Sequence, residues 1–597
     1  MSFSRWCLLG FRSATPSVRI TQRRGLALLL AIGLGGGLLG CHDLTGSQAL
    51  PAGTPAPSFY KNATGALGMR NAAVFAFVNL LPGYIVNSGL LSDELTDLST
   101  ITGASQGVQL QNGGAVTDPV DERILPEQPY GSNTAYGTDQ AYTQLQGART
   151  AILQALGQLA AYDSTAQDIA ILKPAVDSVL RGELYALYGL DEVMLADLFC
   201  SGIPLSTLDF QKDFTYRAGS TTVQVYQDAL AKFDTALALS GDSARIQNLA
   251  RVGQGRAYLD LGQAAVAADD VALVPTGFQY QVQSTWSLGG GASPDVLNAV
   301  ATVSNDEGGN GLPFLTSGDP RTADTSVTFN ISFTTYTAGF PKKYTAGLGG
   351  AFTAPVTVAD GVEARLIQAE AALHAGDVTT WLTTLNQLRT TGTFNGADTV
   401  KVAADTLVDT LGYTGCTAVG SCDDNGYQTS VNYASLVLLT SYPITVPDPS
   451  PEIATCRAVN PNRTFSCINP QVNVYGSNVV PVVPLQIHFK WQAGTGGVSG
   501  LAPLPDPGLS SPTPDSARVV LLFQERASWL YLTGHRQGDL RRLLRQYSRY
   551  WPDESQAYPN GTYLGLGAGN YGTNVNAPIP GAEYINPLFH GCVDRAP

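Results

Sequence analysis

Two short segments near the end of the chain carry residues that could act as an acid and a base. Glu525 and His535 stand ten positions apart, and a carboxylate with an imidazole is a common pair for proton transfer. Charged residues on adjacent helices more often form ion pairs that fix helix packing, and Gly534 would permit the turn between two such helices. We therefore expect a structural role and assign no catalytic residue among Glu525, Arg526, His535, Arg536 and Asp539.

A second group of carboxylates, Asp93, Glu94 and Asp97, could bind a cation. Acidic groups of this kind near a helix end are more often caps or parts of a solvated loop. The sequence contains no phosphate-binding loop and no His-Glu-x-x-His pattern. The cysteines are not spaced like zinc ligands, and there are only five histidines. We expect neither a metal nor another cofactor.

Cys41 is the residue whose chemistry the sequence indicates most clearly. It follows Leu38-Leu39-Gly40, which places an aliphatic residue three positions before it and a small residue directly before it. The preceding segment has five arginines, no acidic residue and then the apolar run Leu26–Leu39, which is shorter than the roughly 20 residues of a spanning helix. We predict that residues 1–40 are a lipoprotein signal peptide, rather than an uncleaved anchor, and that Cys41 is diacylated. Residues 41–60, rich in Pro, Gly, Ser and Thr, would form a flexible tether.

Composition limits the possible partners. Removal of residues 1–40, with their five arginines, changes the formal charge from −14 to −19. Nucleic acid is therefore a poor partner, because its phosphates require a basic face. No later apolar run is long enough to span a bilayer, so we expect a protein held at a membrane by lipid alone. Charged residues are only 14% of the chain, and 64 glycines and 35 prolines indicate long uncharged loops.

The cysteines support export to an oxidising compartment. Beyond Cys41 there are six, which can pair in any of about 15 ways. Cys416 with Cys422, and Cys456 with Cys467, are near in sequence and are the preferred pairs. This choice leaves Cys200 with Cys592.

Hydrophobic periodicity predicts helices over much of the chain. Leucines and a methionine between Leu180 and Leu198 recur at helical spacing, and so do the apolar residues between Tyr226 and Leu237. Two regions, near 222–270 and 360–390, consist of helices separated by Gly262-Gln263 and Gly376-Asp377 turns, which is typical of tetratricopeptide-like helical hairpins. Further helices are expected at Arg518–Leu532 and Asp539–Tyr547.

Two long loop-rich excursions interrupt these helices. Residues 271–355 contain glycine clusters and an alternating Thr/Ser stretch, and residues 390–515 contain four cysteines and many prolines. We expect both to carry short strands. Loops this long in a compact domain usually bind something.

Several motifs stand in a fixed order along the chain: Gly89–Asp97; Arg181–Tyr188 with Gly202-Ile203-Pro204-Leu205; the hairpins Leu249–Asp269 and Ala364–Leu388; Gln524-Glu525-Arg526, Gly534-His535-Arg536 and Asp539-Leu540-Arg541-Arg542; and Pro578-Ile579-Pro580, Glu583 and Asn586-Pro587. Taken together and in this order, they resemble the RagB/SusD family of nutrient-binding outer-membrane lipoproteins. The six cysteines after Cys41 are a departure from the family pattern.

The resemblance implies a function. Members of the family lie on the outer face of the outer membrane and cap a TonB-dependent, SusC-type barrel transporter. They capture oligosaccharides or other nutrients and act as a hinged lid over its pore. The tetratricopeptide-like helices generally face the transporter, and variable loops form the ligand surface.

A sugar-binding surface needs exposed aromatic rings, on which the C–H faces of sugars stack. The candidates in loops are Trp286, Tyr280, Tyr136, Tyr130 and Trp491. Aromatic residues are more often core or interface residues, so each is a hypothesis. Trp286, which precedes Ser287, Leu288 and three glycines, is the first choice.

The sequence thus predicts one mainly α-helical, SusD-like domain over residues 61–597, with helical hairpins and loop excursions bearing short strands. The expected function is capture of a nutrient, an oligosaccharide by preference, for a partner transporter, without catalysis. Two alternatives remain open. One is a helical-repeat scaffold of the cell envelope without ligand, and the other is a secreted glycoside hydrolase, which would require two carboxylates facing a cleft.

Overall fold

The computed structural model describes residues 62–97, 120–127, 137–162, 172, 174–208, 214–286, 301–331, 334–341, 352–390, 501–563 and 570–597. The chain divides into two units, Met1–Thr54 and Pro55–Pro597, and all described residues belong to the second. Cys41 and the predicted tether therefore lie outside the described residues.

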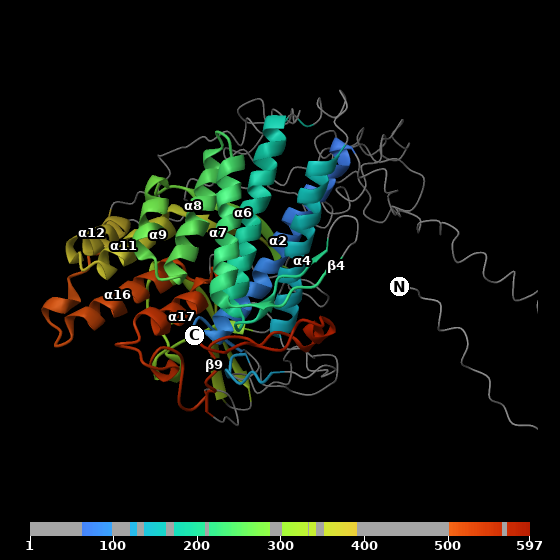
Figure 1. Cartoon of the computed structure of the whole chain (residues 1–597). Helices are drawn as coiled ribbons and strands as arrows, with labels where there is room; N and C mark the ends of the chain where they lie inside the picture. Colours follow the sequence, from blue (N-terminus) through green and yellow to red (C-terminus); the bar gives the residue numbers. More distant parts are fainter. Residues whose placement is uncertain are drawn as a thin grey trace, which may run out of the picture. The chain divides into compact units, whose positions relative to one another are not determined.

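Long helices that pack side by side form the main body of the second unit (Figure 1). α2 packs on α4 and α6, α6 packs on α7, and α7 packs on α8. Their bounds are Ala63–Leu91 for α2, Gly137–Ala161 for α4, Pro174–Leu198 for α6, Thr222–Leu239 for α7 and Ala244–Asp260 for α8. Local sequence sets the helix starts: Asn62 accepts a hydrogen bond from the Gly65 N–H, and Thr221 with Gln224 forms a capping box. The mainly helical fold that the sequence predicts is confirmed.

α2 differs from the sequence-based expectation. Among the described residues it is long and apolar enough to cross a membrane by length and composition. The prediction that no apolar run beyond the signal has spanning length is therefore wrong. Within the protein, 78% of its most apolar window is buried. Burial of this degree is typical of the central helix of a large core.

The predicted helical hairpins are present. In the first region α8 is followed by α9 (Ala264–Asp270), and in the second α11 (Gly361–His374) is followed by α12 (Val378–Thr390). Gly262 and Gly376 adopt φ values of +75° and +79° at the two turns, where side chains on other residues would be strained. Contacts between α9 and α11 and between α8 and α11 join the two hairpins.

Two further helices complete the described part of the helical body, α16 (Pro514–Trp529) and α17 (His535–Gln546). Both helices are expected from the sequence, but each starts about a turn earlier than predicted: α16 at Pro514, which occupies its first turn, and α17 at His535, directly after Gly534. A second cluster of buried apolar side chains, distinct from that of the long helices, joins α11, α12, α16 and α17, and it includes Trp381, Leu385, Leu522 and Leu540.

Short antiparallel strand pairs occupy the first predicted excursion and the connections between helices. The longest pairs are β6 (Gln279–Trp286) with β10 (Phe352–Asp360), and β8 (Asp324–Ile331) with β9 (Thr334–Pro341). The shorter pairs are β1 (Leu95–Asp97) with β7 (Ala301–Val303), β2 (Ile203–Pro204) with β5 (Gly219–Ser220), and β3 (Thr207–Leu208) with β4 (Phe214–Thr215). Most of the second excursion, residues 391–500, lies outside the described residues.

One disulfide closes a very long loop. Cys200, just after α6, is bonded to Cys592, which stands 392 positions later. The pairing that remained after the other four cysteines were assigned to their near neighbours is therefore confirmed. Cys416, Cys422, Cys456 and Cys467 lie outside the described residues, so their pairing stays a prediction.

Candidate functional site

The charged motifs near the end of the chain lie at the junction of α16 and α17. Gly534 stands directly before α17 with φ +85°, and a Cβ on it would lie 2.3 Å from the ring of Tyr84 in α2. Only glycine meets both the conformation and the space at this position. The tight junction turns α17 so that its polar side chains face the interior of the protein, where most of them are buried.

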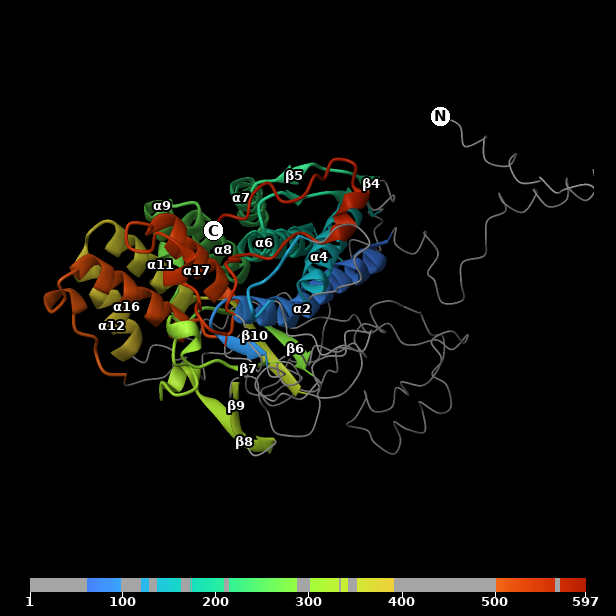
Figure 2. The ribbon, with the colours of Figure 1, turned by 90° about the horizontal axis from the view of Figure 1, so that it is seen from below.

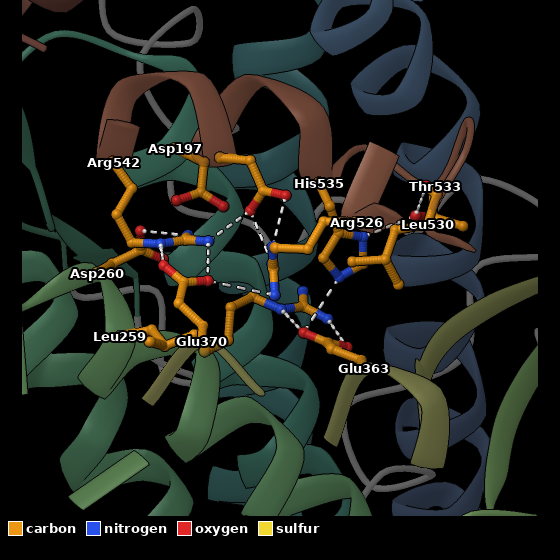
Figure 3. A network of polar contacts seen from close by, with 12 residues as sticks. Asp197, Leu259, Asp260, Glu363, Glu370, Arg526, Leu530, Thr533, His535 and Arg542 are labelled. Carbon is orange, nitrogen blue, oxygen red and sulfur yellow. Dashed lines mark hydrogen bonds and ion pairs between the residues drawn. The ribbon is translucent and has the colours of Figure 1, made fainter. Parts of the chain in front are cut away.

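Arg526 and Arg542 bind acidic partners in a buried network (Figure 3). Arg526 donates through Nε and Nη2 to both carboxylate oxygens of Asp539, at 2.8 and 2.7 Å. Arg542 donates to both oxygens of Glu370 in α11, at 2.9 and 3.0 Å, and to Asp539 at 2.8 Å. Burial alone would raise the pKa of Asp539, but Arg526 and Arg542 outweigh it and hold that pKa well below its ordinary value. The network thus fixes α17 against α16 and α11 with paired charges.

A second bidentate ion pair links α17 to the beginning of the domain. Arg536 donates to Asp93 at 2.6 and 2.9 Å, and Asp93 also accepts from the Leu312 N–H at 2.9 Å. Glu94 accepts from the Leu532 N–H at 2.9 Å. Asp93 and Glu94 are both fully buried, so the expectation of a cap or a solvated loop is wrong for them. Their oxygens bind protein donors, because the loop that carries them packs beneath α17.

His535 is held in the same region by contacts of both ring nitrogens. Its Nδ1 lies 2.7 Å from the Thr533 hydroxyl and its Nε2 lies 3.2 Å from Glu363 Oε1. Burial lowers the pKa of His535, and Arg256 lowers it further. Burial would raise the pKa of Glu363, but Arg256, with help from His535, overcomes this and lowers it to about 2. Two-pronged hydrogen bonds from Arg256 at 2.7 and 2.8 Å account for that effect.

The space at the centre of this network is too small for a substrate. A cavity of about 10 Å³ lies there, enough for roughly one water molecule. It is lined by Asp197, Arg256, Leu259, Asp260, Glu363, Ile367, Arg526, His535, Gly538, Asp539 and Arg542. A sugar ring could not approach His535 through it. The geometry therefore supports the structural role that the sequence predicts for Arg526, His535, Arg536 and Asp539.

Glu525 is buried and binds arginines outside this network. It accepts from Arg321 at 2.7 Å and from Arg389 at 2.6 Å, so it joins α16 to α12 and to the loop before β8. The carboxylate and the imidazole that could have formed an acid–base pair thus have different partners. Among the described residues no group of three or more His, Cys, Asp or Glu side chains is arranged to hold a metal ion.

Sequence reasoning did not identify the acidic partners of α17. Glu363 and Glu370 come from a helix more than 150 positions before α17, and Asp260 from one still further away. A signal for them was present, because α17 contains four arginines in twelve residues and several of them had to be buried if the helix packed at all. Buried guanidinium groups require carboxylates or carbonyls, but the sequence does not say which ones.

The predicted ligand-binding aromatics have different outcomes. Tyr280 lies in β6 with none of its surface exposed, its hydroxyl donates to Glu183 at 2.9 Å, and Arg245 lies 4.4 Å above its ring. The expectation that Tyr280 presents a ring to a ligand is therefore wrong, because β6 turns this residue toward the helical core. Trp286 is the last residue of β6 and is paired in register with Phe352 of β10. Tyr130, Tyr136 and Trp491 lie outside the described residues.

Comparison with known proteins finds similar folds at low sequence identity. A SusD superfamily protein of Bacteroides vulgatus is 13% identical, with 90% of this chain and 99% of that chain covered and a TM-score of 0.47. NanU of B. fragilis is 13% identical, with 92% and 100% covered and a TM-score of 0.46. A laminarin-binding SusD-like protein is 13% identical, with 88% and 98% covered and a TM-score of 0.45.

No protein-family model and no curated protein matches the chain. Two of these three structures, the B. vulgatus protein and the laminarin-binding protein, are described as SusD superfamily or SusD-like proteins. At 13% identity and a TM-score of 0.47, the likeness says nothing of what this chain binds.

Proposed function

We propose that this protein is a SusD-type lipoprotein anchored in the outer membrane and facing the cell surface. It captures an oligosaccharide and delivers it to a TonB-dependent, SusC-type transporter. One observation carries the proposal. The motif segments Gly89–Asp97 and Gly534-His535-Arg536, separated by more than 400 positions, meet in the buried Asp93–Arg536 pair, and two further motif segments meet in the buried Arg526–Asp539 pair. Motifs matched by chance would have no reason to contact one another in the fold.

The segment around Cys41 supports the proposed location at the outer membrane. The aliphatic residue and the small residue before this cysteine, after an apolar run too short to span a bilayer, favour cleavage and diacylation. A tether of about 20 residues before α2 would then hold the helical body near the membrane. The helical hairpins of α7–α9 and α11–α12 are the part that, by the resemblance, would face the transporter.

A binding function fits the buried charges better than catalysis does. The acid and base groups of the network are enclosed and already paired, so they cannot reach a glycan. The ligand surface is expected at the loops next to β6 and β10, where Trp286 ends its strand. Trp286 is the first choice because Ser287, Leu288 and three glycines follow it in the sequence, and aromatic rings stack on sugar faces.

The proposal is tested with the purified chain on a glycan array, followed by affinity measurement for any glycan retained. We expect micromolar-range or weaker binding to one class of oligosaccharide without any change in glycan mass. Trp286→Ala should abolish that binding, while Trp551→Ala, in a partly buried residue next to the second core cluster, should leave it unchanged. Circular dichroism checks that both variants fold.

Two outcomes would contradict the proposal. Cleavage of a glycan by the pure protein would indicate a hydrolase instead. Failure to bind any glycan, together with co-purification of several envelope proteins and no TonB-dependent barrel, would indicate a helical-repeat scaffold. Co-purification of such a barrel with the full chain would support the proposed partner.

A further inference from the structure

Two adjacent carboxyl groups of α6 are buried without the hydrogen-bond donors that such groups require. Asp191 and Glu192 have none of their surface exposed. Neither carboxylate oxygen of Asp191 has a hydrogen-bond partner, and no N–H or hydroxyl group donates to Oε2 of Glu192. We call these two residues the α6 carboxyl pair. A buried polar group without hydrogen bonds is costly, and a buried charge without them is far more costly.

Two cations and a third carboxyl group approach the α6 carboxyl pair from the neighbouring helices. α6 lies between α4 and α7 (Figure 2). Arg149 of α4 donates through Nε to Glu192 at 3.3 Å, and Lys232 of α7 donates to Asp228 at 2.8 Å. Arg149 and Lys232 both lie over the ring of Tyr188, at 5.6 and 5.0 Å from its centre. The three helices thus bring their charged groups into one cluster.

The charges of this cluster do not balance when every group is ionised. The α6 carboxyl pair and Asp228 would carry three negative charges, whereas Arg149 and Lys232 carry two positive ones. Tyr188 also faces these groups, and burial raises its pKa, so its hydroxyl stays neutral. A net charge removed from water is strongly destabilising. One bound proton would balance the cluster.

The contact between Glu192 and Asp228 indicates where such a proton can be held. Their carboxyl groups form a hydrogen bond between α6 and α7. A carboxylate only accepts hydrogen bonds, so two carboxyl groups can bond to each other only when one of them carries a proton. The side chain of Asp228 is 39% exposed and is already paired with Lys232. Burial therefore favours the neutral form on Glu192.

Arg149 also holds the segment that follows α6. Its Nη1 donates to the Ser206 carbonyl at 2.6 Å, and its Nη2 donates to the Leu205 carbonyl at 2.8 Å. These two residues lie between β2 and β3, within residues 203–208. If the α6 carboxyl pair carried two negative charges, the guanidinium group would be drawn toward them, because a buried cation is attracted more strongly by a carboxylate than by a carbonyl.

We infer that the α6 carboxyl pair binds a proton and that this proton keeps α4 attached to residues 203–208. At neutral pH the pair holds the proton. In alkaline solution the proton leaves, and Arg149 releases the two carbonyls. Among the described residues no group of carboxylates is arranged to hold a metal ion that could take the place of the proton.

The titration of the pair agrees in direction with this inference. Burial raises the pKa of Asp191, and it raises that of Glu192 to about 8 against the opposing effect of Lys232 and Arg149. The pKa is therefore higher in the folded than in the unfolded chain. The stability that the proton provides is lost as the pH rises through the folded value.

Infrared difference spectroscopy of the full chain at neutral pH tests the bound proton, because a protonated carboxyl group and a carboxylate absorb at different frequencies. Asp191→Asn leaves two carboxylates facing two cations, so this variant does not need the proton. We expect Asp191→Asn to remove one protonated carboxyl band, and Glu192→Gln to remove it as well. Asp242→Asn, at an exposed position between α7 and α8, should change only carboxylate bands.

Hydrogen–deuterium exchange followed by mass spectrometry tests the attachment of residues 203–208. Protection factors, which remove the intrinsic effect of pH on exchange, are compared at about pH 6 and about pH 9, on either side of the pKa of Glu192. In the unaltered protein and in Asp242→Asn, protection of this segment should fall about tenfold, as for the loss of one charge-assisted hydrogen bond. In Asp191→Asn and Glu192→Gln it should stay within about twofold.

Three results would overturn the inference. Spectra in which neither Asp191→Asn nor Glu192→Gln removes a protonated carboxyl band would show that both groups are ionised. Constant protection of residues 203–208 in the unaltered protein would show that the proton does not act on the attachment. An equal fall of protection in the unaltered protein and in Asp191→Asn would assign the change to another titrating group. Circular dichroism checks folding, and either single variant serves if the other does not fold.

Discussion

Arg536 shows how single residues position the parts of this protein. Its guanidinium group is buried, and its Nε and Nη2 both donate to the carboxylate of Asp93, a residue 443 positions earlier. A guanidinium group removed from water is tolerated only with such a partner, so the pair defines where α17 lies against the loop after α2. Arg256 with Glu363 and Arg542 with Glu370 play the same part for α8, α11 and α17.

The first prediction concerns this pair. Asp93→Asn keeps the shape of the side chain but leaves Arg536 as an uncompensated buried charge. We expect the free energy of unfolding in urea to fall by about 3–5 kcal/mol. Asp228→Asn is the control, because the Lys232–Asp228 pair at 2.8 Å is partly exposed and should contribute about 0.5 kcal/mol or less. Similar losses in the two variants would show that burial of the Asp93 pair does not matter.

The second prediction concerns pH. Burial, opposed by a hydrogen bond from Thr96 and reinforced by Asp93, raises the pKa of Glu307 from 4.5 to about 8. Between these values the folded protein holds a proton that the unfolded chain has released, so stability falls as pH rises through this window, by about 1.4 kcal/mol per pH unit for one proton. Below pH 4.5 both states are protonated and the effect is absent.

The measurement is urea unfolding at several pH values between 5 and 8. Glu307→Gln cannot release a proton, so its stability should decline less steeply across this range than that of the unaltered protein. Glu127→Gln, at an exposed position, controls for the loss of one acidic residue. If the slopes of the unaltered protein and Glu307→Gln are the same, the carboxyl group of Glu307 is already ionised in the folded state.

At the scale of elements, close helix packing depends on glycines that face a single aromatic ring. A Cβ on Gly253 in α8 would lie 2.4 Å from the ring of Phe233 in α7, and a Cβ on Gly189 in α6 would lie 2.7 Å from the same ring. Phe233 is fully buried between the two helices. The helices can approach this closely only because both positions lack a side chain.

The third prediction tests this packing. Gly253→Ala should reduce the free energy of unfolding by about 1–3 kcal/mol, because the added methyl group must displace a confined ring. Gly147→Ala in α4 is a matched control, since a Cβ there would meet nothing within 4 Å. Alanine has the better helix propensity, so that variant should be more stable by up to about 1 kcal/mol. A loss of stability in both variants would contradict the packing argument.

At the scale of the whole molecule, the end of the chain is fastened back onto the middle. The disulfide from Cys592 reaches Cys200 at the end of α6, and Arg541 of α17 donates to the carbonyls of Ala196 and Phe199 beside it. The final residues thus contact the first turns of α4, through Glu583 and Tyr142, and the segment after α6, through the disulfide. The described end of the chain is part of the structure and not an appendage.

The fourth prediction concerns this link. Cys592→Ser should lower the free energy of unfolding by about 2–5 kcal/mol, because a very long loop is no longer closed in the unfolded chain. Limited proteolysis should then release a fragment from the last 20 residues sooner than in the unaltered protein. Cys200→Ala should have the same effect. Peptide mapping under non-reducing conditions that found Cys592 linked to another cysteine would contradict the assignment.

The sequence alone was enough for features that depend on neighbouring residues. Helical periodicity predicted α6, α7 and the hairpins, because the apolar side chains on the buried face of a helix recur three or four positions apart in the sequence. The Gly262 and Gly376 turns were identified for the same reason, since the left-handed conformation that ends each first helix favours glycine. The Cys200–Cys592 pair was predicted because the other four cysteines were assigned to their near neighbours in sequence.

Tertiary structure decided everything that depends on distant residues. Tyr280 and Trp286 lie in the same strand, and only the packing of β6 on the helices turns Tyr280 into the core and leaves it bound to Glu183. The partners of α17 come from segments that lie up to 443 positions away. Sequence spacing cannot identify such pairs. A buried charge requires a partner of opposite charge, but which of the many carboxylates lies beside it depends on the fold.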